Sequence, residues 1–332
     1  MSAIKKIKQL GFQWETQDPF LFCAYHKDNY PPGKENLGPD LNLLKGRYIG
    51  QDFTLKDGWR MYHGSKVPGF PAHPHSGFET VTLVEEGFAD HSDSLGAAGR
   101  FGNGDAQWMT AGKGVMHCEM FPLINSDKNN PLLLFQLWLN LPRKSKNVDA
   151  HFRMLWSEEI PVLKENGMQI KIIAGIFNGV QAPSPTPNSW AADPNNEVAI
   201  WTIKMEAGAT WEIPTASEGI NRTLFFYKGN EIVTEGFTIP QEHSLDLIST
   251  EKITITNGNT PAEFLFLQGK PIGETVVQQG PFVANSKEGI QETISQYHKD
   301  QFGGWPWPSH EHVHSPKKGR FAIHADGREE IK

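Results

Sequence analysis

Two short segments of the chain each place potential metal ligands two residues apart. The first is His73-Pro74-His75 and the second is His117-Cys118-Glu119. Because residues i and i+2 point to the same face of a β-strand, the outer members of each segment share one side if both segments are strands. Three imidazoles and a carboxylate that meet in this way form a mixed nitrogen and oxygen ligand shell. Such a shell suits Fe(II), Mn, Ni or Zn better than it suits thiolate-bound metals.

Composition bounds the classes of protein to which the chain can belong. Its 332 residues suggest about two domains, and 38% hydrophobic with 21% charged residues is an ordinary globular composition. The formal charge of −7 argues against direct contact with nucleic acid, which generic DNA binders make with a basic surface. Two cysteines, Cys23 and Cys118, imply no disulfide framework. Without a long apolar run for a signal peptide or membrane span, we expect a cytoplasmic protein.

Short apolar or alternating runs, separated by turns, predict an all-β protein. Residues 78–84 and 132–139 are such runs in the first half, and residues 223–227 and 263–267 are such runs in the second. β-branched and aromatic residues dominate these runs, and helical periodicity is weak. We therefore expect two jelly-roll barrel or β-sandwich domains in one chain, with a few short helices.

Several local patterns refine this picture. The polar, basic segment at residues 141–147 is typical of a link between domains, and residues 160–166 suggest a short helix. The proline-rich segment 181–194 is expected to be a loop, and Asn257-Gly258-Asn259 predicts a hairpin. The best helical pattern runs from Ser286 to Phe302. We expect domains at residues 1–145 and 146–302, followed by an irregular tail, 303–332, that packs on the body.

Two glutamates are candidates for the carboxylate that would complete the metal site. Glu79 lies four residues after His75, and Glu119 lies two residues after His117. Both have the parity to face inward with their histidine partners, and in a barrel with histidines on two adjacent strands the spacing favours Glu79. The composition does not distinguish the two.

The wider sequence resembles the pirin family over roughly residues 60–300. The resemblance is carried by long, specific motifs rather than by single residues. These motifs lie at residues 73–82, 91–96, 104–120, 135–142 and 280–285. The longer N-terminus around Pro19–His26 and the tail segment Gly319–Ala322 are similar to those of bacterial pirin-like proteins.

The resemblance implies a bicupin with one iron site in the N-terminal cupin. Its ligands would be His73, His75, His117 and Glu119, so the resemblance selects Glu119 and leaves Glu79 a supporting role. Fe(II) is the metal that this family leads us to expect, with Ni, Mn, Co or Zn as alternatives. The second domain, whose histidine His243 has no partner at this spacing, is expected to hold no metal.

The chain departs from the family pattern at three positions. Ser76 stands where an arginine is frequent, which removes a cation near the mouth of the site. Cys118 replaces a smaller residue, and on a strand it would point away from the metal, as neither ligand nor nucleophile. Ala106 replaces a larger aliphatic residue, which affects packing.

Other histidines are weaker candidates for chemistry. His310-Glu311-His312-Val313-His314 could bind Ni²⁺ or Zn²⁺, although an aromatic-anchored tail packed on the body is the more ordinary interpretation. His63, just before the first motif, could line the pocket or be structural. Phe78, Trp108 and Met109 are candidates for the pocket wall, although strand alternation requires that some of them point elsewhere.

Two functional hypotheses follow. The first is a mononuclear iron dioxygenase similar to quercetin 2,3-dioxygenases, which acts on a small aromatic or enolic substrate and dioxygen, with Glu119 as the base for the substrate hydroxyl. The second is a non-catalytic, iron-dependent regulator that binds a protein partner, such as a transcriptional complex or a metabolic enzyme. Turnover of flavonols by the iron-loaded protein distinguishes the two.

Overall fold

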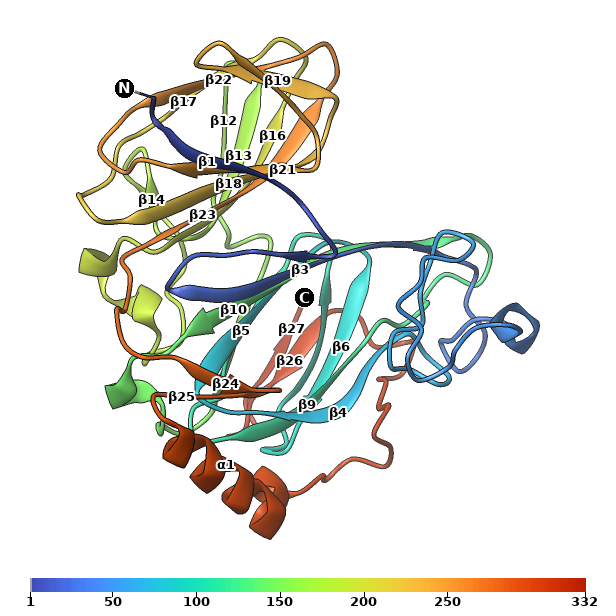
Figure 1. Cartoon of the computed structure of the whole chain (residues 1–332). Coiled ribbons are helices and arrows are strands. Elements are labelled where there is room, and N and C mark those ends of the chain that lie inside the picture. Colours follow the sequence, from blue (N-terminus) through green and yellow to red (C-terminus); the bar gives the residue numbers. More distant parts are fainter. Residues whose placement is uncertain (1) are drawn as a thin grey trace. The chain divides into compact units, whose positions relative to one another are not determined.

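The computed structural model describes residues 2–332, which form two compact units (Figure 1). The histidine unit comprises Tyr25–Gln136, Arg143–Ser157 and Glu274–Lys332, and it contains both histidine segments. The companion unit comprises residues 2–24, Leu137–Pro142 and Glu158–Gly273. This division differs from the continuous domains expected at 1–145 and 146–302, because the N-terminal strand pairs within the companion unit and the last residues belong to the histidine unit.

The companion unit is built from antiparallel sheets around an apolar core. One sheet has the order β1-β21-β18-β23-β16-β13-β12 and the other has the order β17-β22-β19-β20. Trp201, Trp211 and Phe266 are among the buried residues of the core. The strands of the two sheets are β1 (Ile4–Gln9), β12 (Val162–Glu165), β13 (Met168–Ala174), β16 (Ala199–Met205), β17 (Thr210–Ile213), β18 (Asn221–Lys228), β19 (Glu231–Thr234), β20 (Phe237–Pro240), β21 (His243–Leu247), β22 (Ile253–Asn257) and β23 (Ala262–Gly269).

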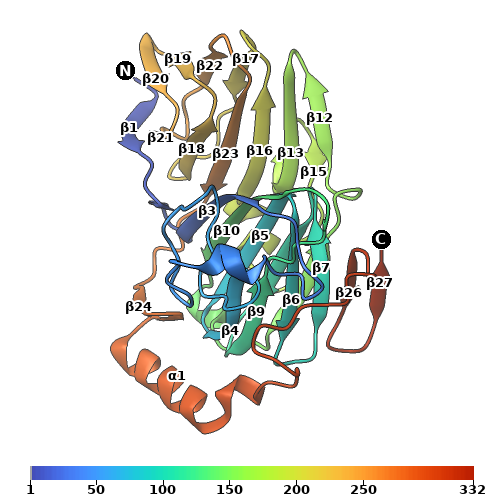
Figure 2. The ribbon, with the colours of Figure 1, turned by 90° about the vertical axis from the view of Figure 1, so that its right-hand side faces the viewer.

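Two further sheets lie wholly or mostly in the histidine unit. One has the order β4-β9-β6-β7-β26-β27, and the other contains β11-β8-β5-β10-β3 in this order. Figure 2 shows β26 and β27 extending the first sheet beyond β7. The strands are β3 (Phe20–Tyr30), β4 (Gly69–His75), β5 (Phe78–Glu86), β6 (Phe88–Asp93), β7 (Ala98–Gly102), β8 (Ala106–Thr110), β9 (Val115–Met120), β10 (Asn130–Asn140), β11 (His151–Leu155), β26 (Phe321–Ile323) and β27 (Glu329–Ile331).

The all-β prediction is confirmed, with open sheets packed as β-sandwiches rather than closed barrels. Short elements complete the fold among the described residues. They are the paired strands β2 (Gln13–Trp14, with β3), β14 (Ile176–Phe177, with β15, Val180–Gln181) and β24 (Val277–Gln279, with β25, Phe282–Ala284), and 3-10 turns at Leu41–Leu44, Arg143–Ser145, Trp190–Ala192, Pro194–Asn196 and Gln301–Gly303.

The predicted C-terminal helix is confirmed as α1, Lys287–Asp300, and the tail beyond it is more ordered than expected. Ser286 begins the helix, and its hydroxyl oxygen accepts a hydrogen bond from the N–H of Gly289 at 3.1 Å. In the tail, Phe321 pairs with Arg100 and Ile323 pairs with Ala98, so β26 is a strand of the histidine unit. Residues 303–332 are therefore not uniformly irregular.

Two local predictions are wrong, and both concern segments at an Asn-Gly pair. Residues 160–166 contain β12 instead of a helix, and β12 returns into β13 through Asn166-Gly167. Both turn residues have positive φ (48° and 73°), as a two-residue type I′ hairpin requires. At Asn257-Gly258 no such hairpin forms, because β22 pairs with β17 and β19 while β23 pairs with β16 and β18. The Asn257 amide instead donates to the carbonyls of Met205, Glu206 and Thr260.

Candidate metal centre

Three imidazoles converge in the histidine unit. β4 and β9 are antiparallel neighbours, and their register places His73 directly opposite His117. His75 follows His73 on the same face of β4. The ring centroids are 4.5 Å apart for His73 and His117, 4.8 Å for His75 and His117, and 4.7 Å for His73 and His75. One nitrogen from each ring lies within 4.8 Å of the others, which brings three nitrogen ligands to one point.

A hydrogen bond fixes the tautomer of His73. Nδ1 of His73 lies 2.8 Å from the carbonyl oxygen of Pro71, and because a carbonyl only accepts, Nδ1 carries the proton. Nε2 of His73 is then unprotonated, and it lies 3.1 Å from Nε2 of His75. A carbonyl that fixes the far nitrogen of a ring is the usual support for a metal-binding histidine. The lone pair of His73 Nε2 is thus directed toward the point where the three rings converge.

Burial keeps all three rings neutral, which is the form that binds metals. It lowers the pKa of His73 to about 4, and it lowers the pKa values of His75 and His117 well below the ordinary range. Proximity to one another lowers the last two further, while the Pro281 carbonyl raises the pKa of His75.

His117 shows most clearly that the trio fits a metal. Its side chain is 0% exposed, and within residues 2–332 neither ring nitrogen has a hydrogen-bond partner. Buried polar atoms nearly always have a partner, because an unpaired one costs about 1–3 kcal/mol. A divalent metal held by the three imidazoles would supply that partner, so the residues present fit the implied group.

Glu119 lies in the same interior but is held apart from the three nitrogens. Thr82 Oγ1 donates to Glu119 Oε1 at 2.8 Å, and the side-chain amide of Gln136 donates to Oε2. The group of close ligand atoms therefore consists of the three imidazoles. Burial raises the pKa of Glu119, and the bonds from Thr82 and Gln136 act in the opposite direction.

Glu79 points to the other side of its sheet. It lies on β5 three residues before Thr82, so the two side chains leave opposite faces of the strand. Thr82 faces Glu119, whereas Glu79 accepts a 2.6 Å hydrogen bond from Thr110 Oγ1 on β8. The geometry thus places Glu119, and not Glu79, beside the histidines.

The three candidates for the pocket wall separate by the same parity. Phe78 faces inward, with its ring 5.0 Å from that of His75. Met109 lies opposite Thr80, which shares a face with Thr82, so Met109 also faces inward. Trp108 lies on the other face of β8. Ser76, at the arginine position of the family pattern, donates from Oγ to the carbonyl of Gly112 at 3.1 Å.

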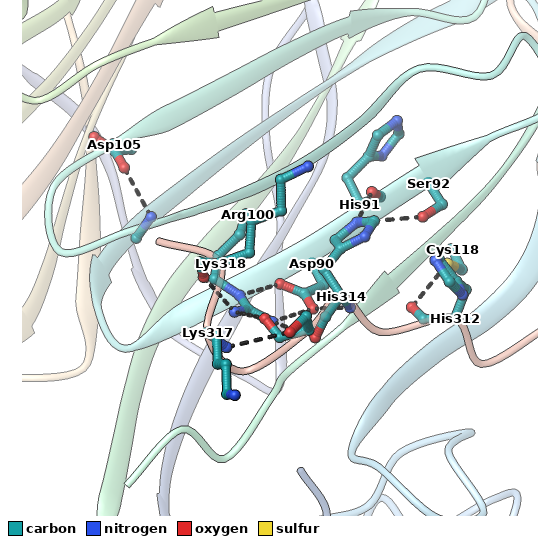
Figure 3. Close-up of polar contacts among 12 residues, drawn as sticks. Asp90, His91, Ser92, Arg100, Asp105, Cys118, His312, His314, Lys317 and Lys318 are labelled. Carbon is teal, nitrogen blue, oxygen red and sulfur yellow. Dashed lines mark hydrogen bonds and ion pairs between the residues drawn. The ribbon is translucent and has the colours of Figure 1, made fainter. Parts of the chain in front are cut away.

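Cys118 lies on the outer face of β9, beneath the C-terminal tail. Its thiol donates to the carbonyl of His312 over 3.7 Å, and burial raises its pKa to about 12 (Figure 3). The thiolate needed for ligation or nucleophilic attack is therefore absent at neutral pH.

An ion pair on the same outer face anchors the tail. Arg100 donates from Nε and Nη2 to the two carboxylate oxygens of Asp90, at 2.7 and 2.8 Å (Figure 3). The remaining guanidinium protons reach the carbonyls of His314, Ser315 and Lys318, at 2.7–2.9 Å. The backbone N–H of His314 in turn donates to Asp90. We call Asp90, Arg100 and residues 314–318 the tail clamp.

The remaining histidine candidates do not join the trio. Nε2 of the buried His314 lies 2.9 Å from the His91 carbonyl, and the His312 ring stacks on Trp307 with centroids 5.0 Å apart. His310 is exposed. His63, which is also exposed, bonds the carbonyl of Gly50. Among the described residues, the tail histidines form no group of close ligand atoms.

Several residues around the trio were not predicted from the sequence. Thr82 and Gln136 hold Glu119, while His91 lies opposite Glu119 on β6 and Asp93 lies opposite His117. The spacing His91-x-Asp93 repeats the two-residue pattern of the recognised segments and could have revealed this third strand. Thr82 and Gln136 carry no comparable signal.

One pocket in the histidine unit lies away from the trio. It measures about 820 Å³ and is lined by α1, by the turns after β4 and β8, and by the segment around Arg143. None of the three imidazoles lines it. Among residues 2–332, no helix is both long enough and apolar enough to cross a membrane.

Comparison with known proteins gives matches along most of the chain. The Pirin family model matches residues 3–139, and the model of the pirin C-terminal cupin domain matches residues 200–303. "Pirin-like protein 2" of Arabidopsis thaliana is 34% identical over 72% of this chain and 72% of its own length. "Putative quercetin 2,3-dioxygenase PA3240" of Pseudomonas aeruginosa is 36% identical over 70% of this chain and 79% of its own length. A crystal structure of quercetin 2,3-dioxygenase from Acinetobacter baumannii shares the fold, with a TM-score of 0.72, 24% identity, and coverage of 92% of this chain and 99% of that one.

Proposed function

Because this chain belongs to the pirin family, we propose that it is a metal-dependent dioxygenase of the quercetin 2,3-dioxygenase type. Its substrates would be flavonols such as quercetin, or related aromatic enols, together with dioxygen. The observation that carries the proposal is the convergence of three neutral, buried imidazoles on one point beside a buried carboxylate. A relative of 36% identity that bears the dioxygenase name supports the reaction class.

In the proposed centre, His73, His75 and His117 hold the metal and Glu119 is the fourth ligand. Glu119 would reach the metal by a side-chain rotation that exchanges a bond from Thr82 or Gln136 for metal contact. A shell of three nitrogens and one oxygen is compatible with Fe(II), which we propose, and also with Ni, Mn, Co or Zn. A redox-active metal, when bound, supplies Lewis-acid polarisation of substrate oxygens and a path for electrons to dioxygen.

The side chains of the chain would perform the proton transfer. Burial raises the pKa of Glu119, which strengthens it as a base for the hydroxyl proton of a flavonol. Thr82 and Gln136 donate to its two oxygens and so orient the carboxylate. Phe78, which packs against His75, would keep water from the reacting atoms.

The proposal is tested by aerobic turnover of quercetin with iron-loaded protein. Loss of the flavonol absorbance in the wild type, with none in His75→Ala, is the expected result. His310→Ala is the matched control, because this histidine is exposed and lies outside the trio. Iron that stays tightly bound without turnover of several flavonols and catechols would overturn the enzyme proposal in favour of a regulator.

A further inference from the structure

Beside the metal centre, a second set of buried polar side chains has unpartnered atoms. Gln107 on β8 is 0% exposed, and within the described part of the chain neither its amide nitrogen nor its amide oxygen has a hydrogen-bond partner. The same holds for the hydroxyl of Thr80 on β5 and for Nδ1 of His91 on β6, both also 0% exposed. None of these atoms has a role in the metal centre as described above.

Strand register directs these three side chains into the interior that contains Glu119. Gln107 lies directly opposite Thr82, whose hydroxyl binds Glu119. Thr80 shares the face of Thr82 on β5. His91 approaches from the other sheet, where it lies directly opposite Glu119. The three thus come from both sheets and face the same interior as the trio, where the ring centroids of His91 and His117 are 5.5 Å apart.

The ring of His91 is fixed so that one nitrogen is left for a ligand. Its plane stacks on Phe152, with centroids 5.2 Å apart and an angle of 14°. Nε2 lies 3.2 Å from the Asp93 carboxylate, which accepts, so Nε2 carries a proton and Nδ1 is the nitrogen without a partner. His91 therefore offers one ring nitrogen, Gln107 a donor and an acceptor, and Thr80 a hydroxyl that can act as either.

Leaving these groups without partners would be costly. Each unpaired buried donor or acceptor destabilises a protein by about 1–3 kcal/mol, and an apolar side chain of the same shape would avoid that loss. Native proteins rarely contain such groups unless a ligand or ordered water completes them. Four such atoms gathered beside the trio therefore indicate a polar ligand or ordered water rather than a defect in packing.

We propose that Gln107, Thr80 and His91 form a second, metal-independent half of the substrate site, which recognises the hydroxyl groups of a polyhydroxylated aromatic. Phenolic O–H groups both donate and accept, which matches the mixed set that these residues present. The proposal rests on the proposed function, because it places the ligand at the same centre. It adds that hydroxyl groups remote from the metal-binding pair determine which substrates bind.

The consequence is a preference among flavonols that the metal alone would not produce. Quercetin and 3-hydroxyflavone share the oxygen pair that would face the metal, but 3-hydroxyflavone lacks the other hydroxyl groups. A site built to bond a hydroxyl leaves its own buried groups unpaired when the analogue lacks one, and this discriminates strongly. We expect wild-type protein to bind quercetin at least about 10-fold more tightly.

The test uses full-length protein loaded with redox-inert Zn²⁺, with binding followed by flavonol fluorescence. In Gln107→Leu we expect the preference for quercetin to disappear while the melting temperature stays equal or rises, since an unpaired amide is removed. Gln291→Leu, on the exposed face of α1, should keep the wild-type preference. Thr80→Val offers a second, smaller change of the same kind.

Two results would overturn the inference. One is equal affinity for the two flavonols in the wild type. The other is a Gln107→Leu variant that melts lower yet keeps the preference, which would show that water satisfies the amide and that its role is structural. Binding is measured on the zinc-loaded protein, without turnover, so the two proposals can fail separately. If the iron-loaded protein does not oxidise quercetin while the zinc-loaded protein keeps the preference, the proposed reaction is refuted and this site stands.

Discussion

The tail clamp allows a quantitative prediction for Arg100→Met. The substitution removes both bonds to Asp90 and three bonds to tail carbonyls, and it leaves the Asp90 carboxylate 0% exposed. Breaking a buried ion pair from one side costs about 3–5 kcal/mol, because the remaining charge stays uncompensated. We expect a loss of that size in the free energy of unfolding, measured with urea.

The same substitution should expose Cys118. The thiol lies under the tail, against the His312 carbonyl. If the tail opens about 3 kcal/mol more easily, labelling of Cys118 by a thiol reagent should accelerate by roughly two orders of magnitude. A Cys23→Ala background removes the other thiol from the assay.

Two controls make the clamp prediction specific. Arg328→Met removes an arginine whose side chain is 58% exposed, and it should change the unfolding free energy by no more than about 0.5 kcal/mol. Adding Asp90→Leu to Arg100→Met removes the stranded charge and should restore part of the stability. The reasoning is refuted if Arg100→Met unfolds within about 1 kcal/mol of wild type and labelling stays slow.

Two further predictions concern burial and backbone conformation. Burial lowers the pKa of His26 to about 3, so between that value and about 6.5 the unfolded chain binds more protons than the folded one. The stability contributed by neutral His26 is full above about pH 6.5 and declines as the pH falls. His26→Leu lacks this dependence, so for each unit by which the pH is lowered its free energy of unfolding should rise by about 1.4 kcal/mol relative to wild type. Urea unfolding of both proteins at pH 6 and pH 5 measures this difference. An equal slope in both proteins would contradict this. Gly77 has a φ of +84°, and a Cβ there would lie 1.8 Å from the Val283 carbonyl oxygen. Gly77→Ala should therefore lower the melting temperature by several degrees, whereas Gly96→Ala, also at positive φ but in open space, should cost less; equal costs would refute the steric argument.

Local spacing predicted that the three histidines share one side of their strands, but it did not decide which glutamate lies near them. His73-x-His75 and His117 need strand parity and one pairing to converge; the parity follows from the local pattern, whereas the pairing of β4 with β9 joins distant segments. Glu79 and Glu119 each share a face with a nearby histidine along their own segment. β5 and β9 belong to different sheets. Glu119 points from β9 toward Thr82 on β5, whereas Glu79 leaves β5 on the face opposite to Thr82 and bonds Thr110.

Features that depend on distant pairing were beyond the sequence. Asn166-Gly167 and Asn257-Gly258 carry the same turn signal, and the partners of the flanking strands decide which one forms a hairpin. The order of the tail arises from Arg100, more than two hundred residues earlier, and from pairing between β26 and β7. The polar set around Gln107 is assembled from three strands, so no window of the sequence contains it.

The central claim is that three histidines hold one metal, and the metal content of purified protein tests it most directly. After loading with Fe(II) under anaerobic conditions and removal of free metal, elemental analysis should give about one metal per chain in wild type and in His310→Ala. His117→Ala, with its fold verified by circular dichroism, should retain much less metal, because only two imidazoles would remain and Glu119 is engaged by Thr82 and Gln136. Full metal content in His117→Ala, or its loss in His310→Ala, would contradict the account.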